Sequence, residues 1–352
     1  MKIEINKNRK VGPGEEPYII AELGANHNGD MDLAKKLIIQ AKDSGADCVK
    51  FQSWSKNSIF SKTVYSDNRF LQDDYRDRND YTLEEIVDQY SISEAELKEI
   101  KHFTEEIGID CTSTPFSNKE VDHLVNELNV DFIKIASMDL NNYPFLEYIA
   151  TKNKPIVLST GLSTLAEIDK AIQTIENTGN KQIVILHCIA LYPPTDEQIN
   201  LNNIDTLSRI YPYPIGFSDH TIGTCIPIAA MAKGACIIEK HFTLDKKMEG
   251  WDHAVSADKE ELKIITKARS RISKALGSKR INRVEDQERQ IAFRRSIVTA
   301  RDIKKGEILT NKMLCFKRPG SGIEPSEANR IVGKKANCSI AADTIIKEEW
   351  II

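Results

Sequence analysis

Charged and hydroxyl residues recur at the ends of short apolar segments between residues 18 and about 275. Lys50 lies in the segment DCVKF and Lys134 lies in DFIKI, so both ammonium groups are expected at buried strand ends. A buried ammonium is costly unless an anion meets it. Hydroxyl residues end other segments of this kind, namely Thr112, Ser137, Ser159 and Ser218. Amines and hydroxyls that converge in this way suit phosphate and carboxylate groups, which predicts a small anionic substrate.

Two histidines belong to the last two predicted strands of this region, His220 in GFSDHTIG and His241 in EKHFTLD. If these strands are neighbours in a closed sheet, the two imidazoles can hold a divalent metal, with water and substrate as further ligands. Two protein ligands suit exchangeable Mn or Mg better than structural Zn. The alternative is a pair of hydrogen-bonded histidines without a metal. Glu22, expected nearby with Asp252, can move protons or orient water.

The elements that must position these residues are strands alternating with amphipathic helices. The predicted strands are Tyr18–Leu23, Asp47–Gln52, Asp110–Ser113, Phe132–Ser137, Pro155–Ser159, Ile183–His187, Ile215–Ser218 and Cys236–His241. Several are almost continuously apolar, as parallel strands covered on both faces require. Between them, Ser93 with Glu96 and Thr164 with Glu167 have capping-box spacing, and Asp30 suits an N-cap. The predicted fold class is α/β, a (β/α)8 TIM barrel with its site at the strand ends; an open doubly wound sheet is the alternative.

The sequence pattern changes near residue 277. A polar linker is predicted at Ala275–Asn282, followed by short strands at Ser296–Ala300, Met313–Phe316 and Ser339–Ala341 between glycines. We therefore predict a barrel domain over residues 1–280 and a linker plus small β-rich domain over residues 281–352. Within the barrel, the polar segment from Trp54 to Tyr90 is either a substrate loop or a solvated insertion.

Composition narrows the function classes. The chain has 352 residues with 48 Lys and Arg against 52 Asp and Glu, a net charge of −4, which favours neither nucleic acid nor a membrane as partner. Its seven cysteines are odd in number and lack CxxC spacing, which indicates reduced thiols and a cytoplasmic location. The N-terminus MKIEINKNRK has no apolar signal region. The apolar stretch from Ile222 to Ile238 is interrupted by Lys233, which predicts a buried helix and strand rather than a membrane span.

Ten segments, in order over nearly the whole chain, resemble the N-acetylneuraminate (sialic acid) synthase family, which includes legionaminic and pseudaminic acid synthases. They are IIAELGANHNGD (19–30), GADCVKFQ (45–52), TSTPFS (112–117), IKIASMDLNNYP (133–144), LSTG (158–161), LHCIALYP (186–193), GFSDHTIG (216–223), EKHFTLD (239–245), GWDHAVS (250–256) and FKRPGSGI (316–323). The C-terminal region resembles the SAF (antifreeze-like) domain of these synthases.

The resemblance implies a role for each candidate residue. The phosphoenolpyruvate ligands would be Lys50, Thr112, Lys134, Ser137, Ser159 and Ser218, and the metal ligands would be His220 and His241. Residues at the sugar or the reacting centre would be Glu22, Gln52, Asn79, Tyr192 and Asp252, with Asn79 in a loosely matched loop. Arg318 would contact the N-acyl group of the sugar across a domain-swapped homodimer.

The resemblance also implies the reaction. C3 of phosphoenolpyruvate would attack the aldehyde carbon of an N-acylated amino sugar, with the metal as Lewis acid. Water, positioned by Glu22, would add at C2, and phosphate would leave by C–O cleavage. The lysines and hydroxyls would stabilise the departing phosphate. The catalytic residues would be Glu22, His220 and His241, and the product a nine-carbon sialic-acid-type sugar.

Two departures from the family pattern bear on the acceptor. Ile189 and Ala190 replace residues that are often small and polar, and Trp251 stands where proline is common. A more apolar pocket tolerates a deoxy sugar better. We therefore expect a 2,4-diacetamido-trideoxyhexose as acceptor, with N-acetylmannosamine as the alternative. Rival functions are another metal-dependent barrel aldolase or hydrolase, and a non-enzymatic SAF-containing carbohydrate-binding protein.

Overall fold

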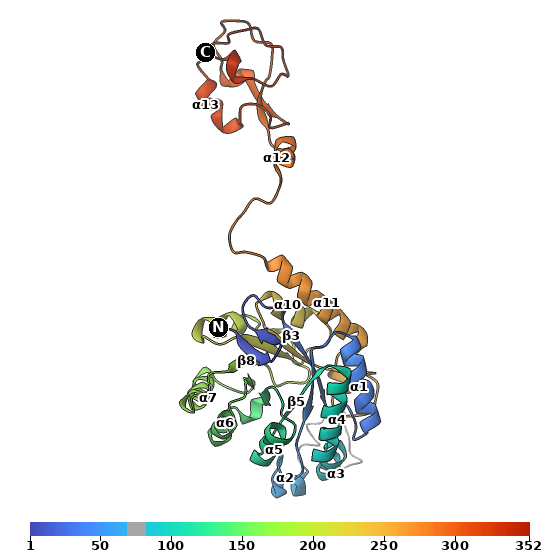
Figure 1. The fold of residues 1–352 in the computed structure, drawn as a ribbon. Coiled ribbons are helices and arrows are strands. Elements are labelled where there is room, and N and C mark those ends of the chain that lie inside the picture. Colours follow the sequence, from blue (N-terminus) through green and yellow to red (C-terminus); the bar gives the residue numbers. More distant parts are fainter. Residues whose placement is uncertain (69–81) are drawn as a thin grey trace. The chain divides into compact units, whose positions relative to one another are not determined.

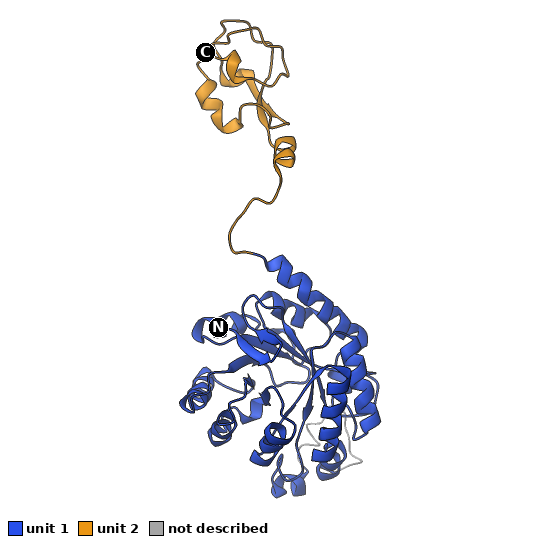
Figure 2. Cartoon of the chain, viewed as in Figure 1, with its two compact units in different colours: residues 1–277 blue, residues 278–352 orange. Residues whose placement is uncertain are grey.

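The computed structural model describes residues 1–68 and 82–352. Within them the chain forms two compact units, Met1–Gly277 and Ser278–Ile352 (Figure 2). Helix α11 (Lys259–Leu276) continues almost to the end of the first unit. The predicted linker from Ala275 therefore begins inside the last turn of a helix.

The first unit is built on eight parallel strands surrounded by helices (Figure 1). The strands are β3 (Tyr18–Gly24), β4 (Cys48–Gln52), β5 (Asp110–Thr114), β6 (Ile133–Ile135), β7 (Ile156–Ser159), β8 (Ile183–Cys188), β9 (Ile215–Asp219) and β10 (Ile237–His241). Their order is β5-β4-β3-β10-β9-β8-β7-β6, and β5 also contacts β6, which closes the barrel. All eight predicted strands and the barrel are confirmed, and the open sheet is rejected.

The side chains that face the inside of the barrel change from apolar to polar along the barrel axis. Near the N-terminal ends of the strands they are apolar, and Ile20, Val157 and Val184 belong to one buried cluster. A hairpin of β1 (Ile3–Asn6) and β2 (Arg9–Val11), which we did not predict, adds apolar side chains to this cluster. Successive inward positions are two residues apart, so the next layer after Ile20 begins with Glu22. The apolar layer therefore supports a polar layer at the C-terminal ends of the strands.

Helices cover the outside of the barrel because each has one apolar face. They are α1 (Met31–Asp43), α2 (Lys62–Asp67), α3 (Leu83–Tyr90), α4 (Glu94–Ile107), α5 (Asn118–Asp122), α6 (Tyr143–Ala150), α7 (Leu165–Asn177), α8 (Asp196–Ile199), α9 (Asn202–Ile210), α10 (Cys225–Ala232) and α11. Asp30 caps α1, and the predicted capping boxes begin α4 at Ser93 and α7 at Thr164. The stretch from Ile222 to Ile238 forms α10 and the start of β10, as predicted. No helix among the described residues is long and apolar enough to cross a membrane.

The second unit has its own apolar core, formed by residues such as Ile297, Leu309 and Ile346. Strands β11 (Ser296–Thr299) and β12 (Leu314–Lys317) pair antiparallel, close to two of the predicted strands, and the helices are α12 (Gln287–Phe293) and α13 (Ala328–Ile331). The predicted strand Ser339–Ala341 is wrong. Only Ile340 forms a bridge, to Ile303, because the chain crosses its neighbour at a single point.

Candidate active site

A cavity of about 280 Å³ opens at the C-terminal ends of the barrel strands. Most of the residues that line it are polar, and they come from all eight strands or the loops that follow them. The lining includes Glu22, Lys50, Gln52, Thr114, Lys134, Ser137, Ser159, Tyr192, Ser218, His220, Glu239 and His241. Ten of the predicted site residues therefore converge on one space, since C-terminal ends of parallel strands meet at the same rim.

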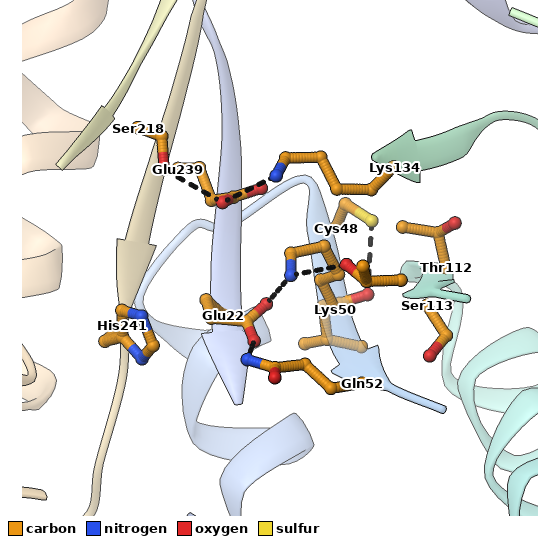
Figure 3. A network of polar contacts seen from close by, with 12 residues as sticks. Glu22, Cys48, Lys50, Gln52, Thr112, Ser113, Lys134, Ser218, Glu239 and His241 are labelled. Atoms are coloured by element: carbon orange, nitrogen blue, oxygen red, sulfur yellow. Dashed lines mark hydrogen bonds and ion pairs between the residues drawn. The ribbon is translucent and has the colours of Figure 1, made fainter. Parts of the chain in front are cut away.

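Two buried lysine–glutamate pairs dominate the electrostatics of the cavity (Figure 3). Lys50 forms an ion pair with Glu22 from the neighbouring strand and donates to the Thr114 hydroxyl at 3.1 Å. Lys134 comes from β6, and its Nζ lies 3.4 Å from Oε1 of Glu239 on β10. The four charged residues are at most 5% exposed. The resting cavity thus compensates its own buried charges, as buried ions require.

Burial and these partners shift the pKa values in opposite directions. Burial alone raises the pKa of Glu239, but Lys134, Lys50 and the Ser218 hydroxyl lower it to about 2. Burial lowers the pKa of Lys50, yet Glu22 and Glu239 outweigh that effect and leave it raised. For Lys134, burial prevails over Glu239 and the pKa is lowered. We regard the pair Lys134–Glu239 as charged, because the carboxylate is the more strongly stabilised ion.

Three predicted hydroxyls line the same cavity. Ser218 donates to Oε1 of Glu239 at 3.0 Å, and Ser137 accepts from the backbone N–H of Gly161 at 3.0 Å. The Ser159 hydroxyl is buried and has no hydrogen-bond partner among the described residues. An unsatisfied buried hydroxyl points to a missing partner. Ser159 can therefore donate to an anionic ligand without breaking an existing bond.

Thr112 has a different environment from the other predicted hydroxyls. It is not among the residues that line the cavity, and its Oγ1 donates to the Phe132 carbonyl at 2.7 Å. Phe132 directly precedes β6, so this bond joins the two strands that close the barrel. Thr114, two residues later on the same face of β5, lines the cavity instead. Of these two threonines, Thr114 is therefore the one whose side chain reaches the cavity.

His220 and His241 lie together at the rim, with ring centroids 5.4 Å apart. Nδ1 of His220 bonds to the Ile189 carbonyl at 2.7 Å, so this nitrogen carries the proton and Nε2 keeps its lone pair. Burial, together with His241, lowers the pKa of His220 to about 3, which keeps the ring neutral. Nδ1 of His241 is buried without a hydrogen-bond partner among the described residues. Two adjacent imidazoles, each with a ring nitrogen that has no hydrogen-bond partner among the described residues, fit a divalent metal.

The surroundings of the two histidines limit the ligand set. Within residues 1–68 and 82–352, no group of three or more His, Cys, Asp and Glu side chains is arranged to hold a metal. Asp252 is an acidic neighbour, with its Oδ2 3.8 Å from Nδ1 of His241. A cation here would have two protein ligands and would need water or substrate to complete its coordination.

A second, largely apolar pocket of about 200 Å³ adjoins the cavity. The two share Gln52, Met138, Tyr192 and His241, and the apolar walls come from Trp54, Ile59, Phe60, Val87 and Trp251. The Trp54 and Trp251 rings lie 5.9 Å apart. Three predicted sugar residues, Gln52, Tyr192 and Asp252, line this pocket, which we call the aromatic pocket. Part of the segment from Trp54 to Tyr90 therefore forms a wall of the site.

The absence of a side chain at Gly24 leaves room for the Glu22 carboxylate beside this pocket. Its φ of +45° lies in the left-handed region, and a Cβ would come within 2.9 Å of Oε1 of Glu22 and 3.1 Å of Nε2 of Gln52. Those two atoms are hydrogen-bonded at 2.8 Å. Only glycine combines this backbone conformation with such a close approach.

Two further sugar contacts were predicted, Asn79 and Arg318. Asn79 lies outside the described residues. Arg318 belongs to the second unit, where its guanidinium lies over the Phe293 ring. Sequence reasoning gave no role to Glu239 and Thr114, although each is two residues from a predicted site residue, His241 and Thr112. The two-residue periodicity of strands was the signal that could have identified both.

Comparison with known proteins identifies the family. A model of the NeuB family matches residues 37–281, and a model of the SAF domain matches residues 294–349. The chain belongs to the NeuB family. Two N,N'-diacetyllegionaminic acid synthases are similar to it. The protein of Campylobacter jejuni is 41% identical, covering 95% of this chain and all of that protein, and the protein of Legionella pneumophila is 37% identical, covering 99% and 98%.

A solved structure supports the same relationship. The N-acetylneuraminic acid synthetase of Leptospira borgpetersenii, crystallised with citrate, has a TM-score of 0.72 to this NeuB family chain. It is 32% identical, and the match covers 83% of this chain and 95% of that one. The predicted family and fold, a TIM barrel followed by a SAF domain, are confirmed.

Proposed function

We propose that this NeuB family enzyme condenses phosphoenolpyruvate with an N-acylated amino-sugar aldehyde to give a nine-carbon sialic-acid-type sugar and phosphate. The observation that carries the proposal is the convergence, in one cavity, of two buried lysines, the Ser159 hydroxyl and the two histidines His220 and His241. Lys50, Lys134, Ser137, Ser159 and Ser218 would hold phosphoenolpyruvate. Thr114 would act where we had expected Thr112. The relatives are named as synthases, which favours this reaction over an aldolase, a hydrolase or a binding protein.

Charge balance supports a role for a cation. The two lysines and two glutamates of the cavity cancel, because 2 − 2 = 0. They offer no net positive charge to a phosphoenolpyruvate anion. Bound Mn or Mg on His220 and His241 would supply two positive charges and Lewis acidity toward the aldehyde oxygen.

Glu22 is suited to orient or deprotonate the water that adds at C2. Its carboxylate is 1% exposed and is held between Lys50 and Gln52. A fixed carboxylate in a water-poor cavity can accept a proton from one defined position. Loss of phosphate from C2 then leaves negative charge beside Lys50 and Lys134, which would stabilise it.

The aromatic pocket supports a 2,4-diacetamido-trideoxyhexose as acceptor. Its walls of Trp54, Phe60 and Trp251 suit methyl groups better than hydroxyl groups, and Ala190 in the cavity lining offers no polar side-chain atom. The names of the two similar legionaminic acid synthases agree with this choice. Gln52, Tyr192 and Asp252 would contact polar groups of the sugar, and Asn79 remains a candidate for the same role.

The rim of the barrel supports a homodimer in which a partner covers the site. The loops after β6, β7, β8 and β9 expose Met138, Leu162, Leu191 and Ile222, with Leu162 at 77% and Ile222 at 63%. Apolar side chains gathered around a polar cavity mark an interaction surface. The SAF domain of a partner subunit is our candidate for that surface, with its Arg318 reaching the N-acyl group in a domain-swapped arrangement.

A cytoplasmic location is part of the proposal. All seven cysteines are free, and four of them are buried inside the first unit: Cys48, Cys111, Cys188 and Cys236. Buried reduced thiols suit a reducing compartment.

The test is phosphate release with phosphoenolpyruvate labelled with ¹⁸O in the C2–O–P bridge. We expect release only when an acylated amino sugar and Mn are both added, with the label recovered in phosphate. A diacetamido-trideoxyhexose should give a higher kcat/KM than N-acetylmannosamine. Release without any sugar, or label retained in the sugar product, would reject the reaction, and a clear preference for N-acetylmannosamine would reject the acceptor.

A further inference from the structure

A buried ion pair lies between the two strands that carry the histidines, outside the cavity lining. Lys240 of β10 and Asp219 of β9 are opposite one another in the parallel ladder. Nζ of Lys240 is 2.7 Å from Oδ2 of Asp219, and their side chains are 1% and 0% exposed. Neither residue lines the cavity, because each points to the opposite face from its neighbours Glu239 and Ser218.

Lys240 and Asp219 also bond to the residue that follows His220. Lys240 also donates to the Thr221 carbonyl, and Oδ1 of Asp219 accepts from the Thr221 N–H at 3.0 Å. The residues before and after His220 are therefore both bound to Lys240. His241 directly follows Lys240 in β10. The ion pair thus links the backbone that carries one histidine to the backbone that carries the other.

Stability gives a weak reason for such a pair. Removing two charges from water offsets most of their attraction, and apolar replacements of buried pairs are often neutral or stabilising. A buried pair does supply fixed geometry, and residues that orient metal ligands typically change metal affinity 10- to 100-fold when they are replaced.

We propose that Lys240 and Asp219 are positioning residues that set the separation and orientation of His220 and His241 for a divalent cation. The inference rests on the proposed metal site. Neither side chain lines the cavity. The pair acts through the backbone on either side of His220, while the bond from Nδ1 of His220 to Ile189 sets the rotation of the ring.

The test is a titration of the full-length chain with Mn²⁺, in which free Mn²⁺ is measured by its electron paramagnetic resonance signal. The variant Lys240→Met/Asp219→Asn removes both charges but keeps an acceptor for the Thr221 N–H. We expect its Kd for Mn²⁺ to rise about 10- to 100-fold. Its affinity for phosphoenolpyruvate, measured with EDTA by calorimetry, should stay within about twofold, which a general loss of structure would not allow.

The matched control is Lys233→Met/Asp205→Asn, which removes another lysine–aspartate pair, between α10 and α9. It should leave both affinities unchanged. Asp219→Asn alone is a milder second variant and should weaken Mn²⁺ binding in the same direction.

Each outcome decides between explanations. Wild-type Mn²⁺ affinity in a folded double variant overturns the positioning role. If neither variant folds, the pair serves the fold rather than the metal site, and the proposal is rejected. If His220→Ala and His241→Ala bind Mn²⁺ as tightly as the wild type, the metal assignment itself fails, and the positioning proposal fails with it.

Discussion

Replacing Lys134 by Met separates ligand binding from fold stability. Met keeps much of the volume of the lysine stem but removes the charge. In the free protein this leaves Glu239 buried without its partner, which costs about 3–5 kcal/mol of folding free energy. The companion variant Lys134→Met/Glu239→Gln removes both charges, so we expect it to recover most of that loss. Thermal unfolding of the two variants measures this difference.

Phosphoenolpyruvate affinity should not recover in the double variant. Lys134 is buried within the cavity, where a hydrogen bond to a charged group contributes about 1.5–3 kcal/mol. At 1.4 kcal/mol for each tenfold change, the apparent Kd for phosphoenolpyruvate should rise about 10- to 100-fold. Calorimetry with saturating Mn measures it.

A control variant removes a comparable pair away from the site. Lys152→Met breaks the bond to Asp122 on the outside of the barrel and should leave phosphoenolpyruvate affinity unchanged. A stably folded double variant that binds phosphoenolpyruvate like the wild type would refute the reasoning, because the charge of Lys134 would then serve only to neutralise Glu239.

Three further substitutions test other parts of the site. Gly24→Ala should displace the Glu22 carboxylate and lower kcat by up to about 100-fold, and an unchanged kcat in steady-state assays would contradict that geometry. Arg318→Ala should raise the KM for the sugar about tenfold or more. Activity should be recovered in mixed dimers in which the other subunit carries Lys134→Met and an intact Arg318. Mixed dimers without activity would count against the cross-subunit contact. Ala190→Thr should change the ratio of the two kcat/KM values about tenfold in favour of N-acetylmannosamine over the diacetamido-trideoxyhexose. An unchanged ratio would mean that residues other than Ala190 determine the choice between these two sugars.

The barrel was predictable because its strands carry strong local signals. Segments such as Ile183–Cys188 are apolar throughout, and capping residues mark the helices between them. The first hairpin also had a signal, since Ile3 and Ile5 alternate with polar residues, but its short strands gave no clear boundary. Isolated bridges, such as Ile303 with Ile340, depend on contacts between distant residues. Local patterns cannot predict them.

The site was predictable as a set of residues but not as a set of contacts. Strand periodicity places Lys134, Ser218 and Glu239 on the inner face of the barrel, yet their pairing depends on the register between strands. The same limit applies to Thr112, whose bond to the Phe132 carbonyl exists only because β5 and β6 close the barrel. The ion pairs that balance the buried charges inside the cavity therefore could not be predicted from the sequence.

A crystal structure of the full chain with phosphoenolpyruvate and Mn²⁺ tests the central claim most directly. We predict that phosphoenolpyruvate lies within hydrogen-bond distance of Lys50, Lys134 and Ser159, while Mn²⁺ is bound by ring nitrogens of His220 and His241 in the same cavity. Phosphoenolpyruvate bound elsewhere on the barrel, or Mn²⁺ held by other residues, would contradict it.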